Sequence, residues 1–136
     1  MTDLKNSSFQ GLIKRRSLIK EGNRPIITIW RRYWMQLWGD ALVLYTAKLF
    51  AQGENRENFR NDPCKYVTIT GWQILVDVNT LTKEFSFQLT DPIRRNVYQF
   101  RTDSLEDTNL WLHHLNIAVN THDISKRSSK NLMSFD

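Results

Sequence analysis

The hydrophobic period of this chain changes only once along its length. Seven short segments between residues 9 and 101 alternate as β-strands do, and turn sequences such as Gly39-Asp40 and Asp91-Pro92 separate them. From Ser104 onward the apolar side chains, led by Trp111, recur at the spacing of an α-helix. A single terminal helix can bury its apolar face against the open end of a closed sheet. The pattern therefore predicts a mainly β fold, a seven-stranded antiparallel barrel or sandwich capped by one C-terminal α-helix.

One folded domain accounts for the whole pattern, because a length of 136 residues fits a single domain. The predicted strands are Phe9–Arg16, Ile29–Trp38, Ala41–Thr46, Tyr66–Ile69, Gln73–Val78, Phe85–Thr90 and Asn96–Arg101. Acidic residues at the head of the last segment favour a helix that begins at Ser104, with Trp111 as its main anchor in the core. We expect the folded domain over residues 9–120, a disordered N-terminal tail over 1–8 and a flexible C-terminal tail over 121–136.

The sequence offers little material for catalysis. His113 and His114 are neighbours on the predicted helix, so their side chains point about 100° apart and cannot share a metal ion. Cys64 is the only cysteine, which is typical of a reducing cytoplasmic setting. No apolar run approaches the roughly 20 residues of a membrane-spanning helix, and no glycine-rich phosphate loop, zinc-ligand spacing or nucleophile elbow is present. We expect a cytoplasmic, non-catalytic domain without metal or cofactor.

The net charge of +5 is concentrated at one end of the sequence. Residues 1–35 contain eight basic and two acidic groups, a net charge of +6, whereas the rest of the chain is almost balanced. A one-sided basic surface predicts an anionic partner, which could be an acidic membrane, an acidic peptide or nucleic acid. The alternative is a solvated charged edge that has no partner.

The first two predicted strands concentrate this charge around the open mouth of the barrel. Because side chains alternate along a strand, Arg15, Arg31 and Tyr33 share the face of the core residues but lie nearer the first loop. That loop carries Lys20 and Arg24. Guanidinium groups give bidentate contacts to phosphate and lysine adds a point charge, so this set suits phosphate monoesters. Protection of a strand edge against aggregation is the alternative role.

The opposite face of the same strands carries a second basic set. Lys14, Arg16 and Arg32 point outward and could form a separate lipid site. Trp30 and Trp34 flank Arg32, an arrangement that would allow a cation–π stack or a platform for nucleic-acid bases. We expect both tryptophans instead to pack beneath the first loop or the helix.

These residues resemble a known family. The stretches that carry the resemblance are Gly11-Leu12-Ile13-Lys14-Arg15, Trp30-Arg31-Arg32-Tyr33-Trp34-Met35-Gln36-Leu37, Phe87-Gln88-Leu89, Val97-Tyr98-Gln99-Phe100 and the helical Trp111. Over roughly residues 9–120 they look like a pleckstrin-homology domain. Further local features resemble the C-terminal pleckstrin-homology domain of Ral guanine-nucleotide exchange factors that carry a Src-homology-3-binding motif; these features are Lys20-Glu21-Gly22, Arg24-Pro25, Ala47-Lys48, Gly71-Trp72 and Asn96-Val97-Tyr98.

The resemblance implies a phosphoinositide-binding module whose parent protein carries its exchange activity in a separate catalytic domain. Arg15 and Arg31 match two basic positions of the family pattern. The arginine usually found two residues after the second is Tyr33 here, and the tyrosine often contributed by the third strand is replaced by Leu44. This departure favours loose binding of anionic lipid over tight binding of a trisphosphorylated inositol.

The combined reading predicts peripheral recruitment to the plasma membrane. Lys20 and Arg24 would steer the domain, Arg15 and Arg31 would hold phosphate, and Ile26 or Ile27 would enter the bilayer interface. The alternative is a protein-interaction or autoinhibitory module with little lipid selectivity, with a small GTPase or an exchange-factor catalytic domain as its partner. We expect a monomer that binds no nucleic acid.

Overall fold

The computed structural model describes residues 9–79, 81–82 and 84–121. Its elements are β1 (Phe9–Ile19), β2 (Arg31–Trp38), β3 (Ala41–Thr46), the 3-10 helix η2 (Arg56–Asn58), β4 (Lys65–Thr68), β5 (Gln73–Asn79), β6 (Glu84–Asp91), β7 (Asn96–Arg101) and α1 (Leu105–Val119). The predicted mainly β fold with seven antiparallel strands and one C-terminal helix is confirmed. The predicted tails at residues 1–8 and 122–136 lie outside the described residues.

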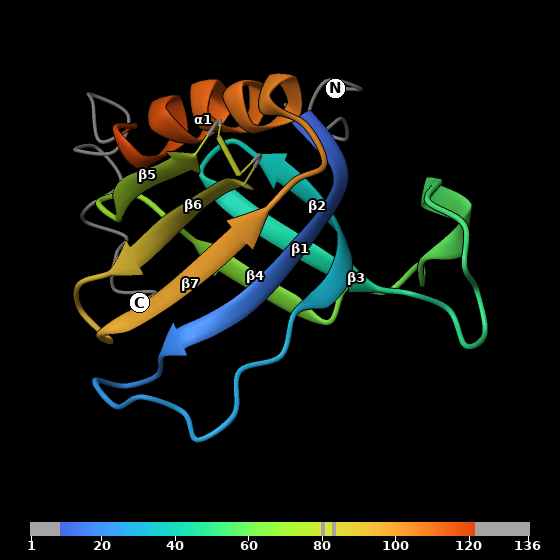
Figure 1. The fold of residues 1–136 in the computed structure, drawn as a ribbon, viewed down its shortest axis with the longest axis horizontal. Helices are drawn as coiled ribbons and strands as arrows, with labels where there is room; N and C mark the ends of the chain where they lie inside the picture. The colour runs from blue at the N-terminus through green and yellow to red at the C-terminus, as the bar shows by residue number, and fades with distance from the viewer. Residues whose placement is uncertain (1–8, 80, 83, 122–136) are drawn as a thin grey trace.

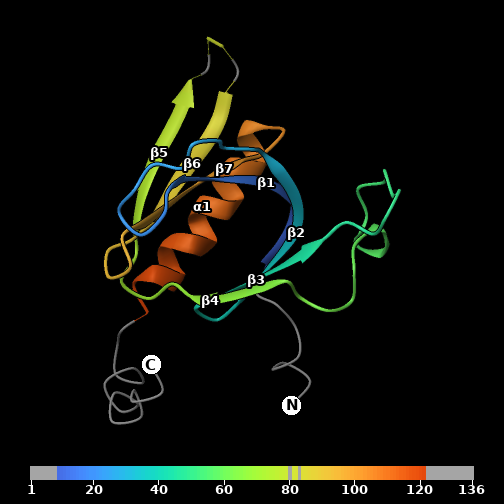
Figure 2. The same ribbon diagram turned by 90° about the horizontal axis from the view of Figure 1, so that it is seen from below.

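All seven strands belong to one antiparallel sheet in the order β4-β3-β2-β1-β7-β6-β5. Strand β1 joins its two halves, because Phe9–Arg15 pair with β2 whereas Lys14–Ile19 pair with β7. The sheet therefore bends around β1, and α1 covers one end of the bent sheet (Figures 1 and 2). The loop between β1 and β2 and the turn between β6 and β7 both lie at the end away from the helix (Figure 1).

The ends of the first two strands differ from the prediction. Strand β1 continues to Ile19 instead of ending at Arg16, because its last residues find new partners in β7 and Ser17 pairs with Tyr98. Strand β2 begins at Arg31 rather than Ile29, since Arg15 and Arg31 form the last pair between β1 and β2. The connection between the first two strands, which the predicted strand ends placed at residues 17–28, therefore spans residues 20–30.

Helix α1 begins and packs as the sequence predicted. The Ser104 side-chain oxygen accepts a hydrogen bond from the Asp107 backbone N–H at 3.1 Å, which satisfies one of the free donors of the first turn. Trp111 is 2% exposed and packs edge-on against Phe9, with ring centroids 4.6 Å apart. At the other end, the Gly71 N–H donates to the Val119 carbonyl at 2.9 Å and so ties the β4–β5 connection to the helix.

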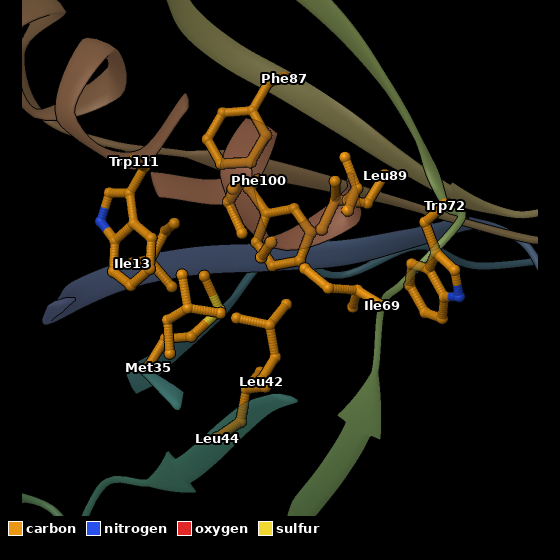
Figure 3. Close-up of a cluster of buried hydrophobic side chains, with 14 of the residues drawn as sticks. Ile13, Met35, Leu42, Leu44, Ile69, Trp72, Phe87, Leu89, Phe100 and Trp111 are labelled. Atoms are coloured by element: carbon orange, nitrogen blue, oxygen red, sulfur yellow. The ribbon is translucent and has the colours of Figure 1, made fainter. Parts of the chain in front are cut away.

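The main core fills the space between the two halves of the sheet. Figure 3 shows Trp111 and Trp72 at opposite ends of this cluster, with Phe100 between them. Phe87 and Phe100 stack with their ring centroids 5.3 Å apart, and neither side chain is more than 2% exposed. Burial of these large aromatic side chains supplies the main driving force for folding.

A second, smaller cluster lies on the outer face of β2 and β3. The β3–β4 loop folds back over this face and buries Phe59 completely against Val43, Tyr45 and the partly buried Trp34. Trp34 packs beneath the β3–β4 loop, so the predicted packing beneath the first loop or the helix is wrong. The outer face of the hairpin is thus partly occupied by the chain itself.

Candidate anion-binding site

The inner face of β1 places Arg15 in an open cavity of about 360 Å³. Its guanidinium carbon lies 4.6 Å from the centre of the Tyr98 ring and 5.3 Å from that of the Tyr33 ring. The Nε atom is buried and has no hydrogen-bond partner among the described residues. Two aromatic rings therefore position a cation whose hydrogen-bonding capacity the surrounding protein leaves unused.

The rest of this inner cavity combines an apolar floor with a basic rim. Its lining residues are Arg15, Leu42, Leu44, Cys64, Lys65, Tyr66, Val67, Trp72, Arg94, Tyr98 and Phe100. Two further cations, Lys65 from β4 and Arg94 from the β6–β7 turn, thus join Arg15, and none of the described residues in the lining is acidic. The cavity can therefore accept an anion without repulsion from a neighbouring carboxylate.

Tyr33 does not line this mouth as the sequence analysis expected. It is only 3% exposed and belongs to the hydrophobic core beside Ile13 and Met35. The alternation predicted for β2 is correct, but Tyr33 lies inside the core, and only the next pair toward the loop, Arg15 and Arg31, reaches open depressions. The Tyr33 ring instead makes a cation–π contact with the Arg15 guanidinium from the side of the core.

Arg31 lines a separate depression of about 270 Å³, which we call the hairpin groove. The groove is bordered by Ser17, Lys20, Pro25, Ile27, Thr28, Ile29 and Arg31. The expectation that Arg15 and Arg31 face one common mouth is therefore wrong, although the two residues are direct partners across β1 and β2. The bend of the sheet at this pair directs Arg15 toward β7 and leaves Arg31 exposed beside the loop.

The loop beyond the groove presents both charge and apolar surface. Arg24 is exposed, Ile26 is 100% exposed and Ile27 is 71% exposed. No ion pair joins Lys20, Arg24 or Arg31 to a carboxylate anywhere in the described part of the chain. These cations therefore remain available to an external anion.

The outer face of β1 is organised around Trp30. The guanidinium carbons of Arg16 and Arg101 lie 4.6 Å and 4.4 Å from the Trp30 ring, so that the indole interacts with two cations. The Arg16 Nε–H also donates to the Gln99 side-chain oxygen at 2.8 Å. Lys14 pairs with Arg101 in the register of β1 and β7. Trp30 therefore takes part in outward cation–π contacts, contrary to the predicted packing beneath the loop or helix.

Arg32 is the register partner of Lys14 across β1 and β2, but its side chain binds the β3–β4 loop. Its guanidinium donates to the carbonyl oxygens of Ala51 at 3.2 Å and Gln52 at 3.4 Å, and its carbon lies 5.5 Å from the Phe59 ring. The side chain thus fastens the β3–β4 loop to β2. The outer face brings Lys14 and Arg16 together with Arg101, a residue for which the sequence predicted no role.

The remaining reactive side chains are placed singly. Cys64 is exposed at the edge of the inner cavity. His114 stacks on Phe9 at 4.6 Å, and partial burial together with the nearby His113 lowers the pKa of His114 below its usual value of 6.5. Among the residues that the structure describes, no three His, Cys, Asp or Glu side chains come together as metal ligands. No described helix is long and apolar enough to cross a membrane.

Three basic residues of the candidate sites were not predicted from the sequence, because they lie far from β1 along the chain. Lys65 starts the edge strand β4, Arg94 lies in the β6–β7 turn and Arg101 ends β7. Only the closure of the sheet brings them beside β1. The adjacent Arg94 and Arg95 next to a turn sequence were the one local signal that could have drawn attention to the β6–β7 turn.

The comparisons with known proteins bear on the family and the fold of the chain. The family model described as PH domain matches residues 7–120. The Ras-specific guanine nucleotide-releasing factor RalGPS1 of Danio rerio is 36% identical over 133 residues, which cover 98% of this chain but 22% of the fish protein. The chain thus spans about a fifth of the length of this relative.

Solved structures share the fold at low sequence identity. The pleckstrin homology domain of ArhGAP27 matches with a TM-score of 0.69 and 16% identity, over 82% of this chain and 99% of that one. The Slm1-PH domain in complex with inositol-4-phosphate matches with a TM-score of 0.58 and 17% identity, over 84% of this chain and 96% of that one. At these identities the two structures establish the fold and nothing finer.

Proposed function

This chain belongs to the PH domain family, and from that premise we propose that it is a non-catalytic module that binds phosphoinositide headgroups and recruits its parent protein to the plasma membrane. The observation that carries the proposal is the inner cavity, where Arg15 is held between two tyrosine rings with an unpartnered Nε and two further cations nearby. A phosphate offers several acceptor oxygens to such donors.

The hairpin groove extends the proposed site toward the membrane. Lys20 and Arg31 border the groove, and Arg24 is exposed on the adjoining loop. In this proposal Arg15 contacts the headgroup inside the cavity, while the three exposed cations attract the anionic lipid surface around it. Ile26 and Ile27, both strongly exposed, then enter the interface.

The magnitudes are compatible with reversible recruitment. Each basic residue close to an anionic leaflet contributes about 1 kcal/mol, so five or six of them supply about 5–6 kcal/mol. Micromolar affinity requires about 8 kcal/mol on the molar scale. Burial of one or two isoleucine side chains contributes roughly the missing 2–3 kcal/mol.

The parent protein proposed for this domain is a Ral guanine-nucleotide exchange factor. Support comes from the similarity to RalGPS1 along nearly the whole of this chain. Because the matched segment is only 22% of that relative, exchange catalysis would reside in another part of the parent protein. The domain would then place this catalytic part near membrane-bound small GTPase.

Liposome sedimentation tests the proposed function. Vesicles of phosphatidylcholine and phosphatidylserine, with and without a few per cent of phosphoinositide, are mixed with the wild type and with the Arg15→Ala/Arg31→Ala variant. We expect phosphoinositide to increase wild-type binding, and the double variant to lose at least about tenfold in affinity, because two charged hydrogen-bonding groups are removed.

A charge-matched variant controls for simple loss of positive charge. Lys48→Ala/Arg60→Ala removes two exposed cations from the β3–β4 loop, away from both cavities. Its phosphoinositide-dependent binding should stay close to that of the wild type. Equal binding by the wild type and the Arg15→Ala/Arg31→Ala variant would overturn the site assignment.

A further inference from the structure

The β6–β7 turn has a defined shape that presents one apolar side chain to solvent. The Asp91 carboxylate accepts hydrogen bonds from the backbone N–H groups of Ile93 at 3.0 Å and Arg94 at 3.2 Å, which fixes the start of the turn. Ile93 is 88% exposed at its tip. The turn thus holds a large apolar side chain in water, beside a residue that lines the inner cavity.

A direct contact joins this turn to the β1–β2 loop. The Gly22 N–H donates to the Arg95 carbonyl at 2.9 Å, and the Glu21 N–H donates to the Asn96 side-chain oxygen at 2.7 Å. We call these two hydrogen bonds the two-loop contact. Because they cross between segments more than seventy residues apart, they fix the position of one loop relative to the other.

The backbone around the two-loop contact is specialised for it. Glu21 and Arg95 have positive φ angles of 51° and 59°, which side-chain-bearing residues rarely adopt, and Gly22 has a φ of 83°. A Cβ atom at Gly22 would lie only 2.9 Å from an Arg95 guanidinium nitrogen. The Arg95 guanidinium could move away from such a Cβ atom, so it is the positive φ at Gly22 that favours glycine where the two loops meet.

The joined loops present apolar and basic groups on the same end of the molecule. Both lie at the end away from α1 (Figure 1). Ile93 is followed directly by Arg94 and Arg95, and the β1–β2 loop carries Ile27 beside the hairpin groove. Neither arginine forms an ion pair within the described residues.

We propose that the two-loop contact makes the β1–β2 loop and the β6–β7 turn one membrane-docking face, in which Ile93 enters the interfacial region of an anionic bilayer and Arg94 and Arg95 meet its phosphate groups. An exposed aliphatic side chain next to two cations that form no ion pair within the described residues matches the layered chemistry of such a bilayer, where phosphates lie above the acyl chains. This inference rests on the proposed function and adds a second insertion point to it.

The experiment compares Ile93→Ser with Ile117→Ser. Ile117 is 58% exposed on α1, so its replacement makes the same chemical change at an exposed isoleucine at the other end of the molecule, without a change of charge. Partition of each variant onto phosphatidylcholine and phosphatidylserine vesicles doped with phosphoinositide is measured beside binding of a soluble inositol phosphate. We expect Ile93→Ser to weaken vesicle partition at least about fivefold and to leave binding of the soluble ligand unchanged, whereas Ile117→Ser changes neither.

A second readout detects insertion directly. The variant Cys64→Ser/Ile93→Cys carries an environment-sensitive fluorophore at position 93, and its emission should shift to the blue when vesicles are added. Gly22→Ala should weaken vesicle partition while melting remains cooperative; Asn96→Ala serves the same purpose if Gly22→Ala fails to fold.

The outcomes separate the two proposals. Wild-type partition by Ile93→Ser, or an unshifted emission at position 93 on vesicles that bind the protein, overturns the docking face and leaves the headgroup site intact. If the wild type binds neither the soluble inositol phosphate nor the vesicles, the proposed function is overturned, and the docking face is overturned with it.

Discussion

The first hairpin carries two adjacent arginines on each strand, Arg15-Arg16 on β1 and Arg31-Arg32 on β2, and their surroundings differ between the inner and the outer face. Arg15 and Arg31 lie on the inner face of β1 and β2, where the first has a buried Nε without a partner and the second is exposed beside the hairpin groove. Arg16 and Arg32 lie on the outer face, where Gln99 and the carbonyls of the β3–β4 loop accept their hydrogen bonds. On each strand the side chain of the inner arginine thus donates no hydrogen bond to the described residues, whereas that of the outer arginine donates at least one.

The difference shows how a basic sequence can divide binding from structure. A guanidinium whose donors are used by the protein gains little from an additional anion, whereas an unpartnered one gains a charge-assisted hydrogen bond. Strand alternation creates both classes from adjacent residues. We therefore expect the inner pair to govern ligand affinity and the outer pair to govern stability, and the following predictions test that division.

The largest effect on stability is expected from Arg32→Ala. This change removes two hydrogen bonds to the β3–β4 loop and the contact with Phe59. The free energy of unfolding should fall by about 2 kcal/mol, which urea denaturation can measure. Phosphoinositide binding of the folded variant should stay within about twofold of the wild type, a difference below about 0.5 kcal/mol. A large loss of binding with unchanged stability would reverse the assignment of Arg32.

A smaller loss of stability is expected from Arg16→Met. Methionine keeps much of the apolar stem but loses the hydrogen bond to Gln99 and the cation–π contact with Trp30. The free energy of unfolding should fall by about 1 kcal/mol. Arg101→Met provides the matched comparison, because it removes only the other guanidinium from Trp30. Unchanged stability of both variants would mean that the outer face does not depend on these contacts.

The smallest effect on stability is expected from a change of pH. This change should alter the free energy of unfolding but not the binding of ligand. The pKa of His114 is lowered by partial burial and by the charge of His113. The unfolded chain therefore binds more protons below about pH 6.5, so stability should decrease as pH falls through that value toward the lower pKa of the folded state. His114→Gln should remove most of this dependence in thermal melts recorded across that range.

Ligand binding provides the contrast in the same pH range. The arginines of the hairpin remain charged at all these pH values, so soluble headgroup binding should follow only the charge of the ligand itself. A binding curve that changes with the titration of His114 would link the helix to the hairpin and weaken the division between the two faces.

Local patterns predicted most of the fold because alternation and helix capping are short-range properties. The burial of Trp111, the cap at Ser104 and the phase of β2 all followed from residues close in sequence. The extension of β1 to Ile19 did not, since it depends on pairing with β7. Strand ends in a bent sheet are set by distant partners.

The candidate site was predicted less completely for the same reason. Arg15 was placed correctly near the open mouth, but Tyr33 proved to be a core residue and Arg31 faces a different depression. Lys65, Arg94 and Arg101 meet β1 only after the sheet has closed. The two-loop contact depends on backbone groups and on a positive φ at Arg95, and neither can be predicted from the pattern of side chains.

Titration of a soluble inositol phosphate into Arg15→Met and Arg16→Met tests the central claim most directly. The two variants lose the same charge from adjacent positions on opposite faces of β1. Isothermal titration calorimetry at constant salt should show at least about tenfold weaker binding for Arg15→Met and nearly wild-type binding for Arg16→Met. Equal weakening of both variants, or a greater loss for Arg16→Met, would contradict the assignment of ligand binding to the inner face.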